Sequence, residues 1–79
     1  MDRNELEQQI FEMIALIYNK DVEELSTETS FKQDLGGASV LMVGLVSEIE
    51  NELDVMVQLQ DAAGCDTIGD LIDVVEEEM

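Results

Sequence analysis

The stretch Asp34-Leu35-Gly36-Gly37-Ala38-Ser39-Val40-Leu41-Met42-Val43 decides the fold, because a glycine pair ends one segment and a serine then opens a strongly apolar run. Glycine pairs are typical of turns, and serine is among the residues preferred at helix N-termini. After this serine, apolar residues recur at helical spacing at Met42, Leu45, Val46, Ile49 and Leu53. The sequence therefore predicts a helix over residues 39–53 that begins at Ser39.

Two further amphipathic helices are predicted before and after this one. The first runs from about Arg3 to Asn19, and its apolar stripe comprises Leu6, Ile10, Met13, Ile14 and Ile17. The last begins near Thr67, where a threonine is followed three residues later by Asp70, as in a capping box. Its inward stripe comprises Ile68, Leu71, Ile72 and Val75.

The two connecting segments lack this periodicity. Residues 21–38 form a predicted long loop, held to the core by spaced apolar residues at Val22, Leu25, Phe31 and Leu35. In residues 54–66 we expect Val55 and Val57 to point inward and Asp61–Gly64 to form a short helical turn. The expected fold is all-α: a single domain over residues 1–79, with three main helices, a short fourth helix and a long loop between the first two.

The charge of the chain restricts its partners. Twenty acidic residues stand against three basic ones, for a formal net charge of −17. Nucleic acids and anionic membrane surfaces are excluded, because both are bound through lysine and arginine. No apolar run approaches membrane-spanning length, and the N-terminus does not resemble a signal peptide. We expect a soluble, cytoplasmic monomer that is bound by basic patches on other proteins.

Few residues are suited to catalysis. Histidine is absent, which removes His-based catalysis and most zinc sites. The many carboxylates do not follow the pattern of a calcium loop. Cys65 has no second cysteine to pair with, and we interpret it as a small core residue. The sequence predicts no catalytic residue, no dedicated metal site and no enzymatic activity of its own.

Ser39 has two possible roles. It can be a helix cap only, which a serine before an apolar helix already explains. Alternatively it is an attachment point, because the preceding glycines clear side-chain bulk and the N-terminus of a helix favours a phosphate ester. The residues alone leave both roles open.

Asp34-Leu35-Gly36 followed by Ser39 and an apolar helix, in a short acidic chain, resembles the acyl carrier proteins of fatty acid and polyketide synthesis. The resemblance extends through Glu50–Asp54 and Thr67–Asp70 to Ile72-Asp73. It implies an acyl-carrier-like bundle in which a phosphopantetheinyl transferase uses coenzyme A to attach 4′-phosphopantetheine to Ser39. Acyl-loading, synthase and acyltransferase enzymes would then exchange acyl groups held as thioesters on this arm.

The chain departs from the pattern of that family around the serine. Ala38 stands where aspartate is usual, and Leu41, Gly44 and Asn51 stand at positions that are commonly acidic. The resemblance thus implies a specialised carrier in fatty acid, lipid or polyketide-type synthesis. Its predicted partner-binding residues are Val40, Leu41, Gly44, Ser47 and Glu48.

Two alternatives accompany this prediction. Leu35-Gly36-Gly37-Ala38-Ser39 is also similar to the motif of peptidyl carrier proteins, which would carry an aminoacyl cargo. The second alternative is a non-carrier acidic interaction module, in which Ser39 is only a cap and Val40, Leu41 and Gly44 form a docking patch.

Overall fold

The computed structural model describes residues 2–36 and 39–79, and for Ser39 it describes the backbone alone. Its elements are α1 (Arg3–Tyr18), the short 3-10 helix η1 (Val22–Glu24), α2 (Ser39–Leu53), α3 (Leu59–Ala63) and α4 (Ile68–Glu78). Within the described ranges there is no strand, and one isolated bridge joins Ser30 to Thr67. The predicted all-α bundle of three main helices and a short fourth helix is confirmed.

The ends of α1 follow from local chemistry. The Asp2 carboxylate accepts a hydrogen bond from the backbone N–H of Glu5 at 2.9 Å and so caps the start of the helix. After Tyr18 the backbone turns left-handed at Asn19, with φ 58°, and the Asn19 N–H donates to the carbonyl of Ala15. Asparagine tolerates this conformation better than most residues, so α1 ends there.

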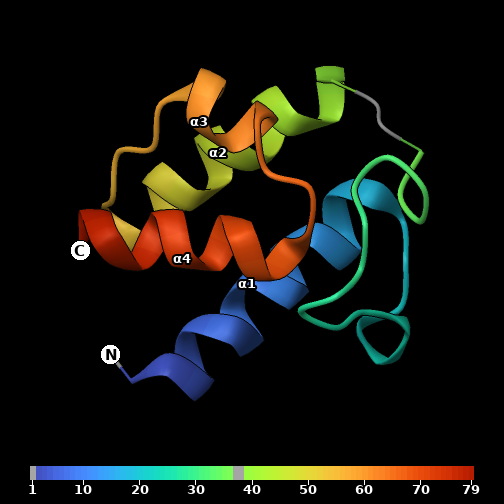
Figure 1. The fold of residues 1–79 in the computed structure, drawn as a ribbon. Helices are drawn as coiled ribbons and strands as arrows, with labels where there is room; N and C mark the ends of the chain where they lie inside the picture. Colours follow the sequence, from blue (N-terminus) through green and yellow to red (C-terminus); the bar gives the residue numbers. More distant parts are fainter. Residues whose placement is uncertain (1, 37–38) are drawn as a thin grey trace.

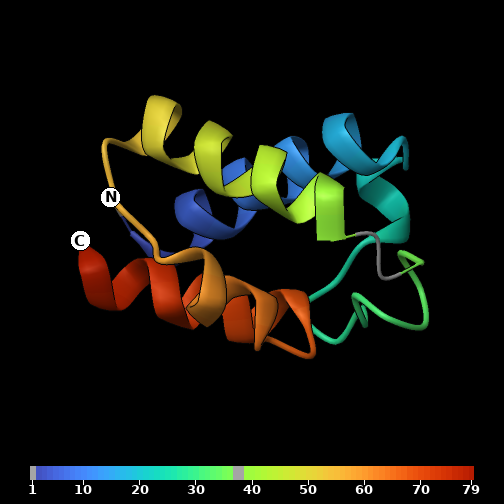
Figure 2. The same cartoon turned by 90° about the horizontal axis from the view of Figure 1, so that it is seen from above.

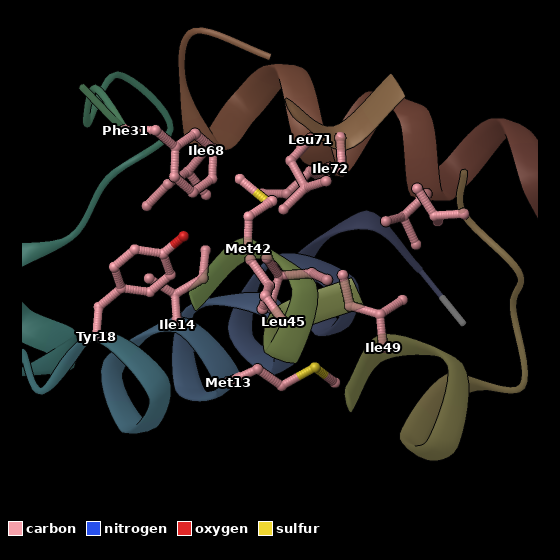
Figure 3. Close-up of a cluster of buried hydrophobic side chains, with 14 of the residues drawn as sticks. Met13, Ile14, Tyr18, Phe31, Met42, Leu45, Ile49, Ile68, Leu71 and Ile72 are labelled. Carbon is pink, nitrogen blue, oxygen red and sulfur yellow. The ribbon is translucent and has the colours of Figure 1, made fainter. Parts of the chain in front are cut away.

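The helices enclose one aliphatic core. α1 and α2 lie side by side, α4 packs against α1, and α3 contacts both α2 and α4 (Figures 1 and 2). Side chains from α1, α2 and α4 meet in the middle, joined by Phe31 from the long loop (Figure 3). The Tyr18 and Phe31 rings lie 6.1 Å apart between centroids. Ile17, expected to point inward, is only half-buried, because Tyr18 fills the last inward position of α1.

The long loop is tied to the start of α4 by backbone hydrogen bonds. Phe31 N–H donates to the Asp66 carbonyl at 3.0 Å, and Ile68 N–H donates to the Thr29 carbonyl at 3.0 Å. Of the predicted anchors, Phe31 and Leu35 are buried, while Val22 and Leu25 are half-buried. Residues 22–35 of the loop are therefore held against the helices by buried side chains and backbone hydrogen bonds.

The second connector differs from prediction at one boundary. Val55 and Val57 are buried as expected, but the short helix α3 begins at Leu59 rather than Asp61. The reason is that the Gln58 carbonyl accepts hydrogen bonds from the N–H groups of Asp61 and Ala62, which closes a turn two residues earlier. Gly64 follows the helix, as expected.

Candidate functional site

The start of α2 is the candidate site, and the chain leading into it is held by a closed turn. The N–H groups of Asp34 and Leu35 both donate to the Ser30 carbonyl, at 2.9 and 3.2 Å. The Asp34 carboxylate accepts from the Ser30 N–H at 2.8 Å, and the Leu35 side chain is buried. An isolated β-bridge between Ser30 and Thr67 joins this turn to the start of α4. Gly37, Ala38 and the hydroxyl of Ser39 lie outside the described residues.

The backbone at Gly36, three residues before Ser39, lies beside open space. Its φ is +83°, in the left-handed region that glycine adopts without steric cost. A Cβ atom built at this position would meet no atom of the described residues within 4 Å. The space beside Gly36 is therefore open, while the predicted clearing of side-chain bulk by Gly36 and Gly37 together stays a prediction.

The first turn of α2 suits a phosphate ester. It contains no acidic residue, although the whole chain carries a net charge of −17. The nearest described carboxylate in sequence, Asp34, is engaged by Ser30. Val40, directly after Ser39, is 80% exposed, so the helix start is open to solvent. The partial positive charge of the helix N-terminus is therefore not opposed by an acid of its own first turn, and the residues present fit a phosphopantetheine group there.

The structure separates the predicted partner-binding residues into an outward set and two flanking residues. Val40, Gly44 and Ser47 are exposed along the outer side of α2. Leu41 is half-buried and packs against the core. Glu48 is also half-buried, and it lines a groove between α2 and α1.

Three exposed apolar side chains, on α2, on α3 and in the connector between them, were missed from sequence. They are Val43 on α2, Met56 in the connector and Leu59 on α3, which packs beside α2 (Figure 1). For two of them, Val43 and Met56, the sequence contained a signal of this exposure. Val43 lies three residues after Val40, and Met56 lies between the inward-pointing Val55 and Val57. We call Val40, Val43, Gly44 and Ser47 the outer face of α2.

Cys65 is not suited to nucleophilic chemistry. It is half-buried against the core, and its thiol donates a weak hydrogen bond to the Asp61 carbonyl, with Sγ and O 3.4 Å apart. Burial, reinforced by the charges of Asp70, Asp61 and Asp66, raises its pKa from 9.0 to about 11. The thiolate is therefore scarce at neutral pH.

The described part of the chain contains neither a metal-binding cluster nor a membrane-spanning helix. Across residues 2–36 and 40–79, no group of three or more cysteine or acidic side chains is arranged to hold a metal ion. None of the described helices is both long enough and apolar enough to cross a membrane.

Comparison with known proteins identifies the family. The family described as "Phosphopantetheine attachment site" matches residues 8–75. An acyl carrier protein of Exiguobacterium sp. strain AT1b is 30% identical over 79 residues, covering 100% of both chains. An acyl carrier protein of Streptococcus thermophilus is 36% identical over 70 residues, which is 89% of this chain and 90% of the relative. One from Clostridium perfringens is 33% identical over 66 residues, covering 84% and 87%.

The fold and the matched region define a phosphopantetheine-dependent carrier protein. The chain belongs to the acyl carrier protein family. The prosthetic group of this family is 4′-phosphopantetheine.

Proposed function

We propose that Ser39 carries 4′-phosphopantetheine and that the chain is a specialised acyl carrier in fatty acid, lipid or polyketide-type synthesis. The observation that carries the proposal is the start of α2. The first turn of this helix contains no acidic residue, Gly36 before it lies in open space, and the loop leading to it is closed by hydrogen bonds to the Ser30 carbonyl. The family match over residues 8–75 spans this region and supports it. The arm's terminal thiol would hold the cargo, and the polypeptide would present it to acyl-loading, synthase and acyltransferase enzymes.

The attachment site is tested by mass spectrometry after incubation with coenzyme A and a promiscuous phosphopantetheinyl transferase. We expect one phosphopantetheine per chain, lost completely in Ser39→Ala. Ser26→Ala is the matched control, because Ser26 is an exposed serine of the long loop, outside α2, and should leave modification unchanged. Modification that persists in Ser39→Ala, or failure with several transferases including one from the native host, would contradict the proposal.

We further propose that partner enzymes recognise the outer face of α2 together with its flanking residues Leu41 and Glu48. The support is the exposure of Val40, Gly44 and Ser47 on a surface without acids, in a chain that is otherwise densely acidic. An exposed apolar patch of this kind is typical of an interaction site.

This recognition is tested with purified, phosphopantetheinylated protein, so that the attachment step does not affect the result. Val40→Asp changes a side chain that is 80% exposed and should leave the fold intact. We expect acyl loading by enzymes of the native host to fall about fivefold or more, as for the loss of an interface anchor. An unchanged loading rate would place recognition elsewhere. The cargo recovered from the arm, acyl or aminoacyl, distinguishes an acyl carrier from a peptidyl carrier.

A further inference from the structure

A groove between α1 and α2 shares only Glu48 with the surface proposed above for partner recognition, and its other lining residues have no role in the proposed carrier function. It has a volume of about 420 Å³ and is lined by Gln9, Glu12, Met13, Leu16, Glu48 and Glu52. The α1 residues among these follow helical spacing, and the two from α2 are four residues apart, so the groove runs between these two helices. Its volume lies at the lower end of the range of ligand sites, about 300–1,000 Å³.

The apolar part of the groove comes from α1. Leu16 is 77% exposed, which is unusual for a leucine on a helix whose other face packs into the core. Met13 is buried and lies at the edge of the core cluster, away from the α4 side chains (Figure 3). Together they give the groove a buried apolar floor and one exposed apolar wall. An aliphatic side chain of a partner would fit against both.

The remaining lining is negatively charged and not neutralised by the chain itself. Glu12, Glu48 and Glu52 contribute three carboxylates, and Glu12 accepts one long hydrogen bond, 3.3 Å, from the Gln8 amide. None of the chain's three basic residues is among the described residues that line the groove. Arg3 pairs with Glu7, Asp73 and Glu76, and Lys20 lines a different pocket. A partner would therefore have to supply the compensating charge.

We propose that this groove is a second docking surface, which binds a protein segment that presents an aliphatic side chain flanked by lysine or arginine. The aliphatic group would contact Met13 and Leu16, and the basic groups would pair with Glu12 on one wall and with Glu48 and Glu52 on the other. Charge complementarity would speed association, and the apolar contact would supply selectivity over other acidic parts of the surface. The site is independent of Ser39, because none of its residues lies within the first two turns of α2.

A synthetic helical peptide of leucine and lysine serves as the probe, titrated into isotopically labelled Ser39→Ala protein. This background keeps the result independent of the attached group, so that failure here and failure of the proposed function are distinguishable. We expect amide shift changes to concentrate at Gln9, Glu12, Leu16, Glu48 and Glu52. Shifts centred instead on Val40 and Gly44, or spread evenly over the surface, would overturn the proposal.

Matched variants separate the groove from general acidity. Glu12→Gln with Glu48→Gln should weaken binding about fivefold, the effect of losing two exposed ion pairs. Glu23→Gln with Glu77→Gln removes the same charge from exposed positions outside the groove and should have a much smaller effect. Leu16→Gln, and a peptide with alanine in place of leucine, should each weaken binding as well. Equal losses in both double variants, or a groove response reproduced by spermidine alone, would overturn the assignment to a protein segment.

Discussion

Cys65 is the polypeptide's only thiol, and its surroundings protect it from reaction. Burial and the carboxylates of Asp70 and Asp61 disfavour the thiolate and raise its pKa to about 11. The sequence correctly placed Cys65 against the core, but the raised pKa required the structure. Asp70 and Asp61 lie on different helices, and only the fold brings both close to the sulfur.

We expect Cys65 to react with iodoacetamide at pH 8 about tenfold more slowly than an unhindered thiol. The thiolate fraction falls roughly a hundredfold for a pKa near 11, and the greater nucleophilicity of a more basic thiolate recovers about tenfold of this. The rate, followed by mass spectrometry, should rise steeply as the pH approaches 11. A rate at pH 8 equal to that of free cysteine would contradict the raised pKa.

The same shift predicts how stability depends on pH. Because the folded thiol has a higher pKa than the unfolded thiol, its contribution to stability is complete below about pH 9 and is lost as the pH rises towards 11. Cys65→Ser should reduce this alkaline loss of stability, measured by urea unfolding at pH 8 and pH 10. An identical alkaline loss in Cys65→Ser would show that other groups cause it.

At the scale of elements, the contact between the long loop and α4 depends on Gly69. The Gly69 N–H donates to the Thr27 carbonyl at 2.9 Å, and a Cβ at position 69 would lie 2.9 Å from that same oxygen. Because the obstacle is backbone, it cannot be relieved by rotating a side chain. This close approach fixes the loop that leads to the start of α2.

Gly69→Ala should destabilise the protein by about 1–3 kcal/mol, the usual cost of overpacking. The control is Gly44→Ala, because a Cβ at position 44 meets nothing within 4 Å and alanine is the better helix former by roughly 1 kcal/mol. The two substitutions are chemically identical and differ only in their surroundings. The change in the free energy of unfolding, measured in urea, should therefore be negative for Gly69→Ala and positive for Gly44→Ala. A stabilised Gly69→Ala protein would show that the Thr27 carbonyl does not contact Gly69 closely enough to exclude a Cβ.

The helices followed directly from the sequence because their signals are local. The Asp2 and Thr67 caps and the inward stripe of α2 are all encoded within a few residues of where they act. The backbone bonds from the loop to Asp66 and Ile68 were not predictable, since they join segments more than thirty residues apart and involve no particular side chain. Of the candidate site, the sequence identified the exposed Val40 and Gly44. It did not show that Glu48 lies on the α1 side, because that depends on how the two helices are packed.

At the scale of the whole molecule, Arg3 forms ion pairs with three of the chain's acidic side chains. Its guanidinium lies 3.1 Å from Glu7, 2.9 Å from Asp73 and 2.9 Å from Glu76, and so ties the start of α1 to α4. The hydrogen bonds to Asp73 and Glu7 raise its pKa further above the ordinary value. In a chain with a net charge of −17, these contacts oppose repulsion between the two helices.

Arg3→Gln should lower the free energy of unfolding by about 1 kcal/mol at low salt, because a surface ion-pair network is lost. The loss should shrink in high salt, where screening weakens both the lost attraction and the remaining repulsion. Lys32→Gln is the charge-matched control, since Lys32 makes no ion pair among the described residues. It should cost only a few tenths of a kcal/mol. Equal losses in the two variants would show that net charge, rather than these contacts, sets the stability.

The contacts of Arg3 with Asp73 and Glu76 also determine how the protein can be mounted for measurement. They hold the beginning of α1 beside the final turns of α4, while the first turn of α2 lies at the opposite end of the bundle (Figures 1 and 2). A biotin or affinity handle joined at either terminus would therefore attach to the same pole of the molecule. Chains captured on a sensor chip in this way would all present the start of α2 to the flowing solution, with no need for engineered cysteines.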